Sequence, residues 1–475
     1  MRIFSAFYFF FFFHCMIFYI SCSLTFFGSK MLSAKPACKH FDLQVEVSPH
    51  AVEVGFIRPP LEKRIAATTR SGRVSKTKAA DTTDENEAPS PFAFPGPLVL
   101  PNDALAYDPK EPPQSMRSWA QEKVRNRFIR NRKTLYVMPF PNIPDQLSFM
   151  KKWAVPSSQP RNKAKVGGKI PAPKTEDVVD YLAAFYHPLP VKPFSSTVAF
   201  APWNEDFTTT PDQVGLQIGD EGITGVRTRP CPDGVFPRQL NLNDALDAVL
   251  EALPEDAYAV VLLLEQDTYE DDDDDYCCGR AYGSSRISVV SQARYHPALD
   301  ARPEGGGAVD WGHMWPASHC KAYVRALCAE GANDGEAIDV DMEVGETPMG
   351  AAIQAAVKAG SPAKNLHGLW LSRLVRTVSH ELGHCLCLGH CSYYACVMQS
   401  SASTAEDVRQ PPYLCPVCLA KVTAGLMDVT PQTSAKELQV QRYKALMGFC
   451  ERWTDVSMFT GYRAWLGKRV ESMEG

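Results

Sequence analysis

One stretch of this chain, residues 380–418, constrains the fold more than any other part because it is dense in metal-binding side chains. It contains three histidines and then four cysteines, namely His380, His384, His390, Cys391, Cys396, Cys415 and Cys418. Metal ions hold such side chains at short distances and in fixed geometry, so the fold must gather them closely. The spacing therefore predicts two metal sites that follow each other directly along the chain.

The first two histidines lie on one face of a helix that we predict over residues 365–386. Leucine and valine recur there at three- and four-residue steps, which is typical of a helix with a buried face. His380 and His384 are therefore one turn apart and can reach the same ion. In a helical H-E-x-x-H motif the glutamate, here Glu381, acts as general base on a metal-bound water. The motif predicts a catalytic zinc site that needs one more protein ligand.

His390 is the predicted third ligand of this site. To reach the ion, the chain must leave the helix after His384 and turn back, and Gly389 offers a flexible residue for that turn. An isolated H-E-x-x-H can also be two solvated or core histidines. The third histidine and the cysteines that follow argue against this alternative.

The four cysteines have the spacing of a tetrahedral sulfur site, with the pairs Cys391-x4-Cys396 and Cys415-x2-Cys418. Such a site is closed and structural, and it also helps to position His390, which directly precedes Cys391. Two disulfides are the alternative, and they need an oxidising compartment. The 15 cysteines of the chain are odd in number and show no regular framework, which favours reduced thiols and metal ligands.

The whole segment resembles the archaemetzincins, zinc metallopeptidases of the metzincin group. Their motif is H-E-x-x-H-x-x-G-x-x-H, followed at once by Cys-x4-Cys-x-Met and later by Cys-x2-Cys. The resemblance implies that the three histidines bind the catalytic zinc, that Glu381 is the catalytic glutamate, and that the four cysteines bind a second zinc, so that each chain holds two. It also implies that Met398 supports the catalytic zinc from beneath without binding it.

The sequence departs from that motif at Cys387, where the family has glycine. The motif glycine ends the helix in a backbone conformation that costs an L-residue about 1–2 kcal/mol. Two outcomes are open: Cys387 adopts this turn, or the helix continues and turns at Gly389, which would displace His390 and impair catalysis. A third hypothesis makes Cys385 or Cys387 a thiolate ligand, although packed thiols are the simpler interpretation.

The resemblance further implies the fold and the reaction. The expected fold class is α/β, of the zincin type: a twisted mixed sheet backs the active-site helix, and a smaller four-cysteine zinc subdomain and C-terminal helices follow. The expected reaction is hydrolysis of a peptide or protein substrate, in which zinc activates water and Glu381 carries the proton to the leaving amine. The alternative is a catalytically impaired zinc-binding interaction protein. The net charge of −5 implies no bulk attraction to nucleic acid, and no such partner is expected.

The N-terminal segment, residues 1–30, is almost wholly apolar and has three interpretations. It has the composition of a signal peptide and the length of a membrane anchor, so the protein would be secreted or membrane-bound. Alternatively, translation starts at Met31 and the segment is an artefact. The thiolate-rich zinc site and the resemblance to a mostly intracellular family favour the last interpretation, with the protein in the cytoplasm or nucleus.

The predicted organisation follows from these features. The low-complexity region at 31–132 is expected to be disordered over 58–116. The zincin domain at 133–390 carries an insertion at 299–350, and the four-cysteine subdomain with C-terminal helices occupies 391–475. We expect helices at 118–132, 175–186, 240–253, 320–330, 351–359, 435–450 and 460–474, and strands at 134–138, 257–264 and 287–294. The last strand is the candidate for the edge strand that, in metzincins, pairs with the substrate backbone.

Overall fold

The structure is a computed structural model that describes residues 40–74, 89–157, 170–204, 209–220, 222–300, 308–328 and 344–475. The apolar segment at 1–30 lies outside the described residues. Within the described ranges, no helix combines the length and the apolar character needed to cross a bilayer.

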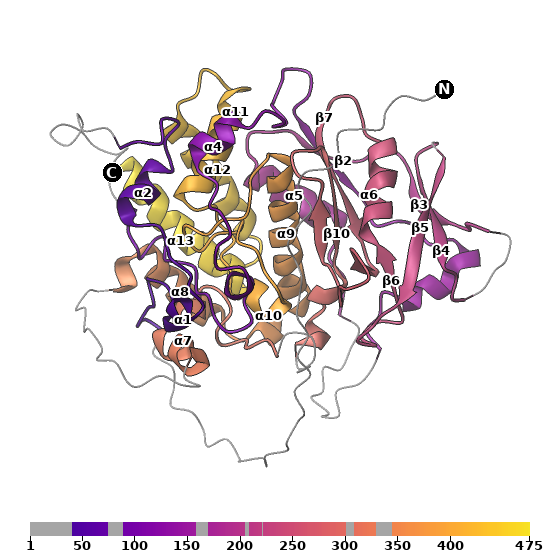
Figure 1. Cartoon of the computed structure of the whole chain (residues 1–475), viewed down its shortest axis with the longest axis horizontal. Coiled ribbons are helices and arrows are strands. Elements are labelled where there is room, and N and C mark those ends of the chain that lie inside the picture. The colour runs from indigo at the N-terminus through magenta and orange to yellow at the C-terminus, as the bar shows by residue number, and fades with distance from the viewer. Residues whose placement is uncertain are drawn as a thin grey trace, which may run out of the picture. The chain divides into compact units, whose positions relative to one another are not determined.

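The first sheet forms the centre of the molecule and follows the order β2-β1-β7-β10-β9. Its strands are β1 (Thr134–Met138), β2 (Val191–Pro193), β7 (Ala257–Leu264), β9 (Gly279–Ala281) and β10 (Ile287–Ser291). The first four strands in this order run parallel, and β9 closes the sheet in the antiparallel direction. Every residue of β7 is buried, because a parallel strand in the middle of a sheet is covered on both faces. Figure 1 shows this sheet beside helix α9 (Leu366–Cys385).

A second sheet packs beside the first in the order β3-β4-β5-β6-β8. Its strands are β3 (Val198–Ala201), β4 (Gln213–Ile218), β5 (Ile223–Pro230), β6 (Arg238–Asn241) and β8 (Asp267–Tyr269). Helix α6 (Leu242–Glu251) contacts β4 and β5 on one side and β10 on the other, so it lies between the two sheets. The sequence analysis expected one sheet and predicted none of these strands.

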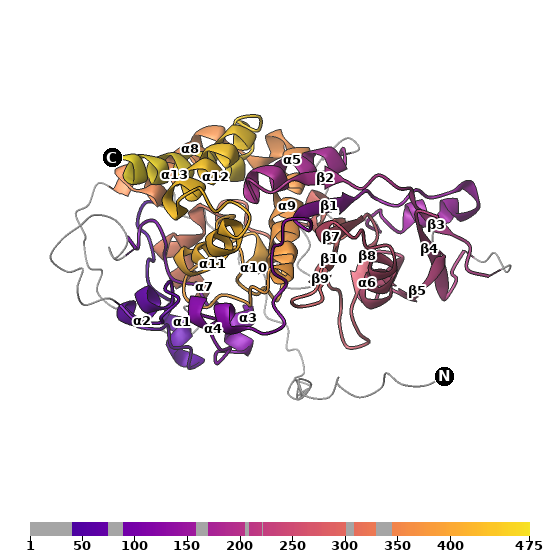
Figure 2. The same cartoon turned by 90° about the horizontal axis from the view of Figure 1, so that it is seen from above.

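Helices cover the opposite face of the first sheet. Helix α9 packs against β7, β9 and β10, and α5 (Thr175–Phe185) packs against α9 and β1. Behind them, α8 (Pro348–Ala359), α12 (Ala435–Cys450) and α13 (Ser457–Glu474) form a helical layer, which Figure 2 shows from above. The remaining α-helices are α1 (Pro49–Glu53), α2 (Leu61–Ala66), α3 (Ala104–Tyr107), α4 (Met116–Gln121), α7 (Lys321–Cys328), α10 (Thr404–Asp407) and α11 (Pro416–Met427).

Several predicted elements match the structure closely, whereas one predicted helix is shorter and one predicted strand lies elsewhere in its sheet. The strand at 257–264 and the helix at 435–450 have the predicted bounds. The predicted helix at 118–132 is the short α4, and the helix predicted from 240 begins at Leu242, where the Asn241 side chain accepts a hydrogen bond from the backbone N–H of Asp244. The strand predicted at 287–294 is β10, which ends at Ser291 and is not an edge strand, because β9 lies outside it.

The expectation of disorder over 58–116 was also wrong for the residues that the structure describes, 58–74 and 89–116. Apolar side chains scattered through this polar stretch are buried, among them Phe94 and Leu98. Its backbone is tied to the C-terminal part of the chain, since Trp465 Nε1 donates to the Ala93 carbonyl oxygen at 3.1 Å and Arg58 Nε donates to the Tyr393 carbonyl oxygen at 3.0 Å. A few well-placed apolar residues therefore pack this segment against the C-terminal part of the chain.

Candidate metal centres and the catalytic cleft

The end of helix α9 decides where the third histidine lies. The helix stops at Cys385, and Cys387 adopts the left-handed conformation with φ of 63°. The Cys387 N–H donates to the His384 carbonyl oxygen at 2.8 Å, and the Leu388 N–H donates to the Gly383 carbonyl oxygen at 3.0 Å. This is the Schellman arrangement that usually ends a helix with glycine at this position. Of the two outcomes open from the sequence, the structure has the turn at Cys387, and Gly389 has no positive φ.

The surroundings of Cys387 hold this turn in place. Its thiol accepts a hydrogen bond from Ser284 Oγ at 2.8 Å and packs against Met116 and Trp119 of helix α4. Trp119 Nε1 donates to the Leu386 carbonyl oxygen at 2.9 Å. Neither Cys385 nor Cys387 joins a cluster of metal-ligating atoms among the described residues, which contradicts the hypothesis that one of them replaces His390.

A pair of substitutions measures the cost of the left-handed residue. Cys387→Gly and Cys387→Ala both remove the thiol, but only alanine keeps a Cβ in the strained conformation. We expect the glycine variant to be more stable than the alanine variant by about 1 kcal/mol in chemical unfolding. The control is Gly448→Ala inside α12, where an added Cβ meets nothing within 4 Å and should stabilise the protein by about 0.5–1 kcal/mol. Equal stability of the two Cys387 variants would show that the left-handed conformation costs an L-residue nothing at this position.

The three histidines converge on one point. Their ligating nitrogens lie within 4.8 Å of one another, and His380 Nε2 is 3.0 Å from His384 Nε2. The opposite ring nitrogen of each is already engaged: Nδ1 of His380 with the Val397 carbonyl oxygen at 2.7 Å, and Nδ1 of His384 with the Leu388 carbonyl oxygen at 2.7 Å. Because a carbonyl oxygen only accepts, these Nδ1 atoms carry the protons and the Nε2 lone pairs face inward.

The third ring is held differently from the first two. His390 Nδ1 lies 2.9 Å from Oε1 of Glu111, a carboxylate from the N-terminal part of the chain. Burial and the neighbouring His390 ring lower the pKa of His384 to about 3, so this ring is neutral, as a metal ligand must be. Burial opposes protonation of His390 as well, but the Glu111 hydrogen bond raises its pKa. Three inward nitrogens with fixed tautomers fit a catalytic zinc, which takes three protein ligands and leaves one position open.

Glu381 lies beside this cluster without joining it. Its side chain faces Gly279 of β9. A Cβ added to Gly279 would lie 3.1 Å from Glu381 Cγ, so the absence of a side chain at this glycine leaves room for the carboxyl group. Burial raises the pKa of Glu381 to about 7, although His390 and Arg280 act in the opposite direction. A carboxyl group with this pKa can both accept and return a proton near neutral pH.

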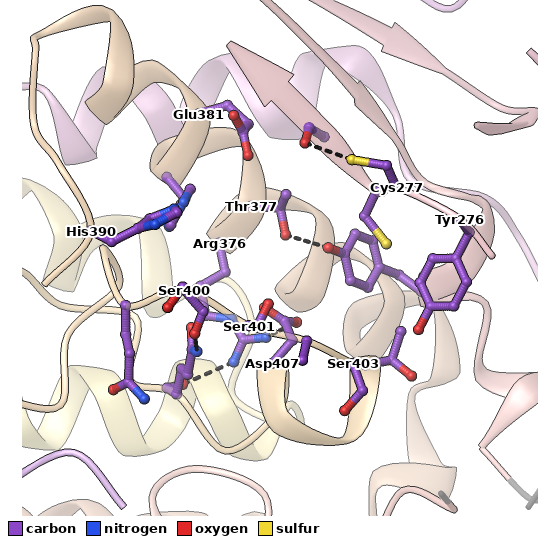
Figure 3. A pocket seen from close by; sticks show the side chains of 18 of the residues that line it. Tyr276, Cys277, Arg376, Thr377, Glu381, His390, Ser400, Ser401, Ser403 and Asp407 are labelled. Atoms are coloured by element: carbon purple, nitrogen blue, oxygen red, sulfur yellow. Dashed lines mark hydrogen bonds and ion pairs between the residues drawn. The ribbon is translucent and has the colours of Figure 1, made fainter. Parts of the chain in front are cut away.

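A cleft of about 380 Å³ opens beside His380, Glu381 and His390. Figure 3 shows Glu381 and His390 on one side and Tyr276 and Cys277 across from them. The lining is mostly polar and comprises Glu270, Asp274, Tyr276, Cys277, Cys278, Gly279, Tyr295, Arg376, Thr377, Val397, Gln399, Ser400, Ser401, Ala402, Ser403, Thr404, Asp407 and Gln410. Strand β9, three residues long, runs along this cleft at the edge of the sheet; the sequence analysis had assigned that role to β10.

Met398 packs directly beneath the helix that carries the ligands. It is fully buried, and a Cβ added to Gly383 would come within 2.4 Å of its sulfur. Its carbonyl oxygen accepts a hydrogen bond from the Cys391 N–H at 2.8 Å. Gly383, which lies between His380 and His384, therefore lets Met398 approach the helix closely. Through its backbone hydrogen bond, Met398 also connects the helix to Cys391.

The four cysteines form the second cluster. Their sulfurs lie within 4.8 Å of one another, all four residues are buried, and all twelve cysteines among the described residues are free of disulfides. Backbone N–H groups point at the cluster, since Cys415 donates to Cys396 Sγ at 3.2 Å. Helix α11 begins at Pro416, so the positive end of its dipole lies at the sulfurs of Cys415 and Cys418. Four buried sulfurs with such donors suit a closed structural zinc.

Comparison with known proteins identifies relatives of this segment. Residues 358–424 match the model of Peptidase family M54. The chain is 28% identical to archaemetzincin-2 of Homo sapiens over 217 residues, which are 46% of this chain and 47% of the relative. It is 46% identical over 56 residues to the archaemetzincin of Aeropyrum pernix, covering 12% of this chain and 31% of that protein. The chain thus spans about half the length of the human relative. The crystal structure of archaemetzincin from Methanopyrus kandleri superposes with a TM-score of 0.29 at 18% identity, covering 62% of this chain and 97% of that one.

Proposed function

We propose that this chain, a member of the archaemetzincin family, is a zinc-dependent peptidase that uses Glu381 as its general base. The observation that carries the proposal is the convergence of one ring nitrogen from each of three histidines beside a buried carboxyl group at the wall of an open cleft. His380, His384 and His390 would hold the ion, which supplies Lewis acidity for a scissile carbonyl and a water molecule. A second zinc, held by Cys391, Cys396, Cys415 and Cys418, would be structural.

The chain's own residues supply the proton transfer. Glu381 accepts the proton of the attacking water and returns it to the leaving amine, as its raised pKa of about 7 allows. Its hydrogen bond with the Ala281 backbone and its position against Gly279 keep the carboxyl group at the cleft wall. Met398 supports the helix from below through its contact with Gly383.

Strand β9 would position the substrate. It ends the first sheet and pairs only with β10 among the described strands, so its outer edge can add an extended peptide by backbone hydrogen bonds. This edge runs past Glu381, which brings the peptide backbone to the reacting groups. The substrate class that fits is therefore a peptide or an extended segment of a protein.

Metal removal tests this function. We expect the protein with two zinc ions per chain to cleave members of a broad peptide library, and a chelator that strips the catalytic zinc to stop cleavage. Adding zinc back should restore it. Mass spectrometry of the products and elemental analysis of the metal give the two readouts. A protein with both sites filled that cleaves no peptide would favour the alternative of a zinc-binding interaction protein.

A further inference from the structure

The stretch from Glu111 to Gln114 joins helices α3 and α4 and makes polar contacts with the end of the active-site segment. Glu111 reaches His390, and Gln114 reaches the turn at Cys387. We propose that Glu111 and Gln114 are positioning residues for the third zinc ligand and thereby set the zinc affinity of the histidine site. This inference rests on the part of the proposed function in which the three histidines bind zinc.

The Glu111 side chain engages Nδ1 of His390, as backbone carbonyl oxygens engage Nδ1 of His380 and His384. The partners of His380 and His384 are carbonyl oxygens of residues 397 and 388, which belong to the same motif segment. The partner of His390 is a side chain 279 residues away in sequence, at 2.9 Å, and its other oxygen lies 3.4 Å from Ser400 Oγ. The His390 side chain is also 37% exposed, so packing restrains its ring less than it would restrain a fully buried one. A carboxylate that accepts from Nδ1 fixes the tautomer and the ring orientation and makes Nε2 a better donor to the metal.

Gln114 secures the turn between the second and third ligands. Its amide nitrogen donates to the Cys387 carbonyl oxygen at 2.9 Å, and its amide oxygen accepts from the Gly389 N–H at 3.0 Å. The same oxygen accepts from Lys421 Nζ at 2.7 Å, and Lys421 lies in the helix that begins at the cysteine cluster. The Gln114 side chain thus binds the backbone on both sides of Leu388, directly after the left-handed residue Cys387. Since the sequence lacks the motif glycine there, this support favours a turn that cysteine adopts at a cost.

Zinc affinity tests the role of Glu111 without reference to peptide cleavage. We expect Glu111→Ala to weaken zinc binding at the histidine site by about 10–100-fold in chelator competition. Glu111→Gln should fall between this variant and the native protein, since its amide oxygen still accepts from Nδ1 but carries no charge. The matched control is Glu62→Ala, which removes an exposed glutamate of α2 from the same part of the chain. The cysteine-bound zinc should stay in place in all variants.

Two further measurements separate positioning from general stability. Cobalt placed in the histidine site should show a changed visible absorption band in Glu111→Ala, because the geometry of one ligand changes, while the zinc-free proteins should unfold at similar temperatures. Gln114→Ala should weaken zinc binding less in a Cys387→Gly background than in the native one, because glycine adopts the turn unaided.

The outcomes distinguish this inference from the proposed function. Unchanged zinc affinity and an unchanged cobalt spectrum in Glu111→Ala would overturn it, even in an active peptidase. Loss of both zinc ions together with a less stable zinc-free protein would also overturn it, because the stretch from Glu111 to Gln114 would then be a purely structural element. An altered affinity in a protein that cleaves no peptide would support the inference and count against the peptidase.

Discussion

Replacing Glu381 by glutamine is expected to reduce peptide cleavage by a factor of about 10²–10⁴ while both zinc sites stay filled. Glutamine keeps the size of the side chain but cannot accept the proton of the attacking water. Glu381 is not one of the converging ligand atoms, so the metal should not depend on it. The measurements are turnover of a peptide found in the library screen and zinc content of the same sample.

The control for this experiment is Glu176→Gln, which makes the same chemical change on the exposed first turn of α5. It should retain the activity of the native protein. Glu381→Ala should behave like Glu381→Gln, because both lack the carboxylate. If Glu381→Gln cleaves peptides as fast as the native protein, another group is the base. If it loses the catalytic zinc, the residue acts through the metal site.

Replacing Cys415 by serine is expected to remove the structural zinc and to destabilise the domain by several kcal/mol, since binding of such an ion contributes about 10–16 kcal/mol in zinc-finger peptides. Serine is a good residue at the start of a helix, so α11 itself should not suffer from the change. Because Cys391 directly follows His390, the catalytic zinc should also bind less tightly. Metal analysis and thermal unfolding measure both effects.

His384→Ala provides the contrast to Cys415→Ser, because it should lose only the catalytic zinc and keep the fold. Cys231→Ser is the matched control, since Cys231 is a buried cysteine outside the cluster and its hydrogen bond to Asp233 Oδ1, at 2.8 Å, can be made by serine. It should keep both ions. Retention of two zinc ions in Cys415→Ser would contradict the cysteine site.

The sequence predicted that the candidate ligands would cluster, because their spacing is local. The helix that carries His380 and His384 shows a continuous apolar period, and the cysteine pairs are close along the chain. Strand β7 was predictable for a similar reason, since eight apolar residues in a row are typical of a strand buried on both faces. Cys387 was recognised as the critical position, but its conformation depends on packing against α4 that no local pattern reveals.

The parts that the sequence did not predict depend on contacts between distant segments. The other strands of the second sheet have three to six residues, and β5, with eight, carries several charged or polar side chains, so its apolar periodicity is weak. Strand β9 has three residues and is recognisable only by its neighbours. Glu111 had no signal at all: it stands in a polar, proline-rich stretch, and its role follows only from its distance to His390.

The hydrogen bonds at the three Nδ1 atoms have a consequence for metal choice. A ring held in this way cannot rotate to present its other nitrogen, so an arriving ion meets three donors that are already in register. Which metal ion binds then depends on whether that ion accepts three imidazole ligands on one side and keeps an open coordination position towards the cleft. Zinc and cobalt tolerate such an arrangement, whereas magnesium and calcium prefer a shell of oxygens. We therefore expect these three imidazoles to discriminate against magnesium and calcium before any reaction begins.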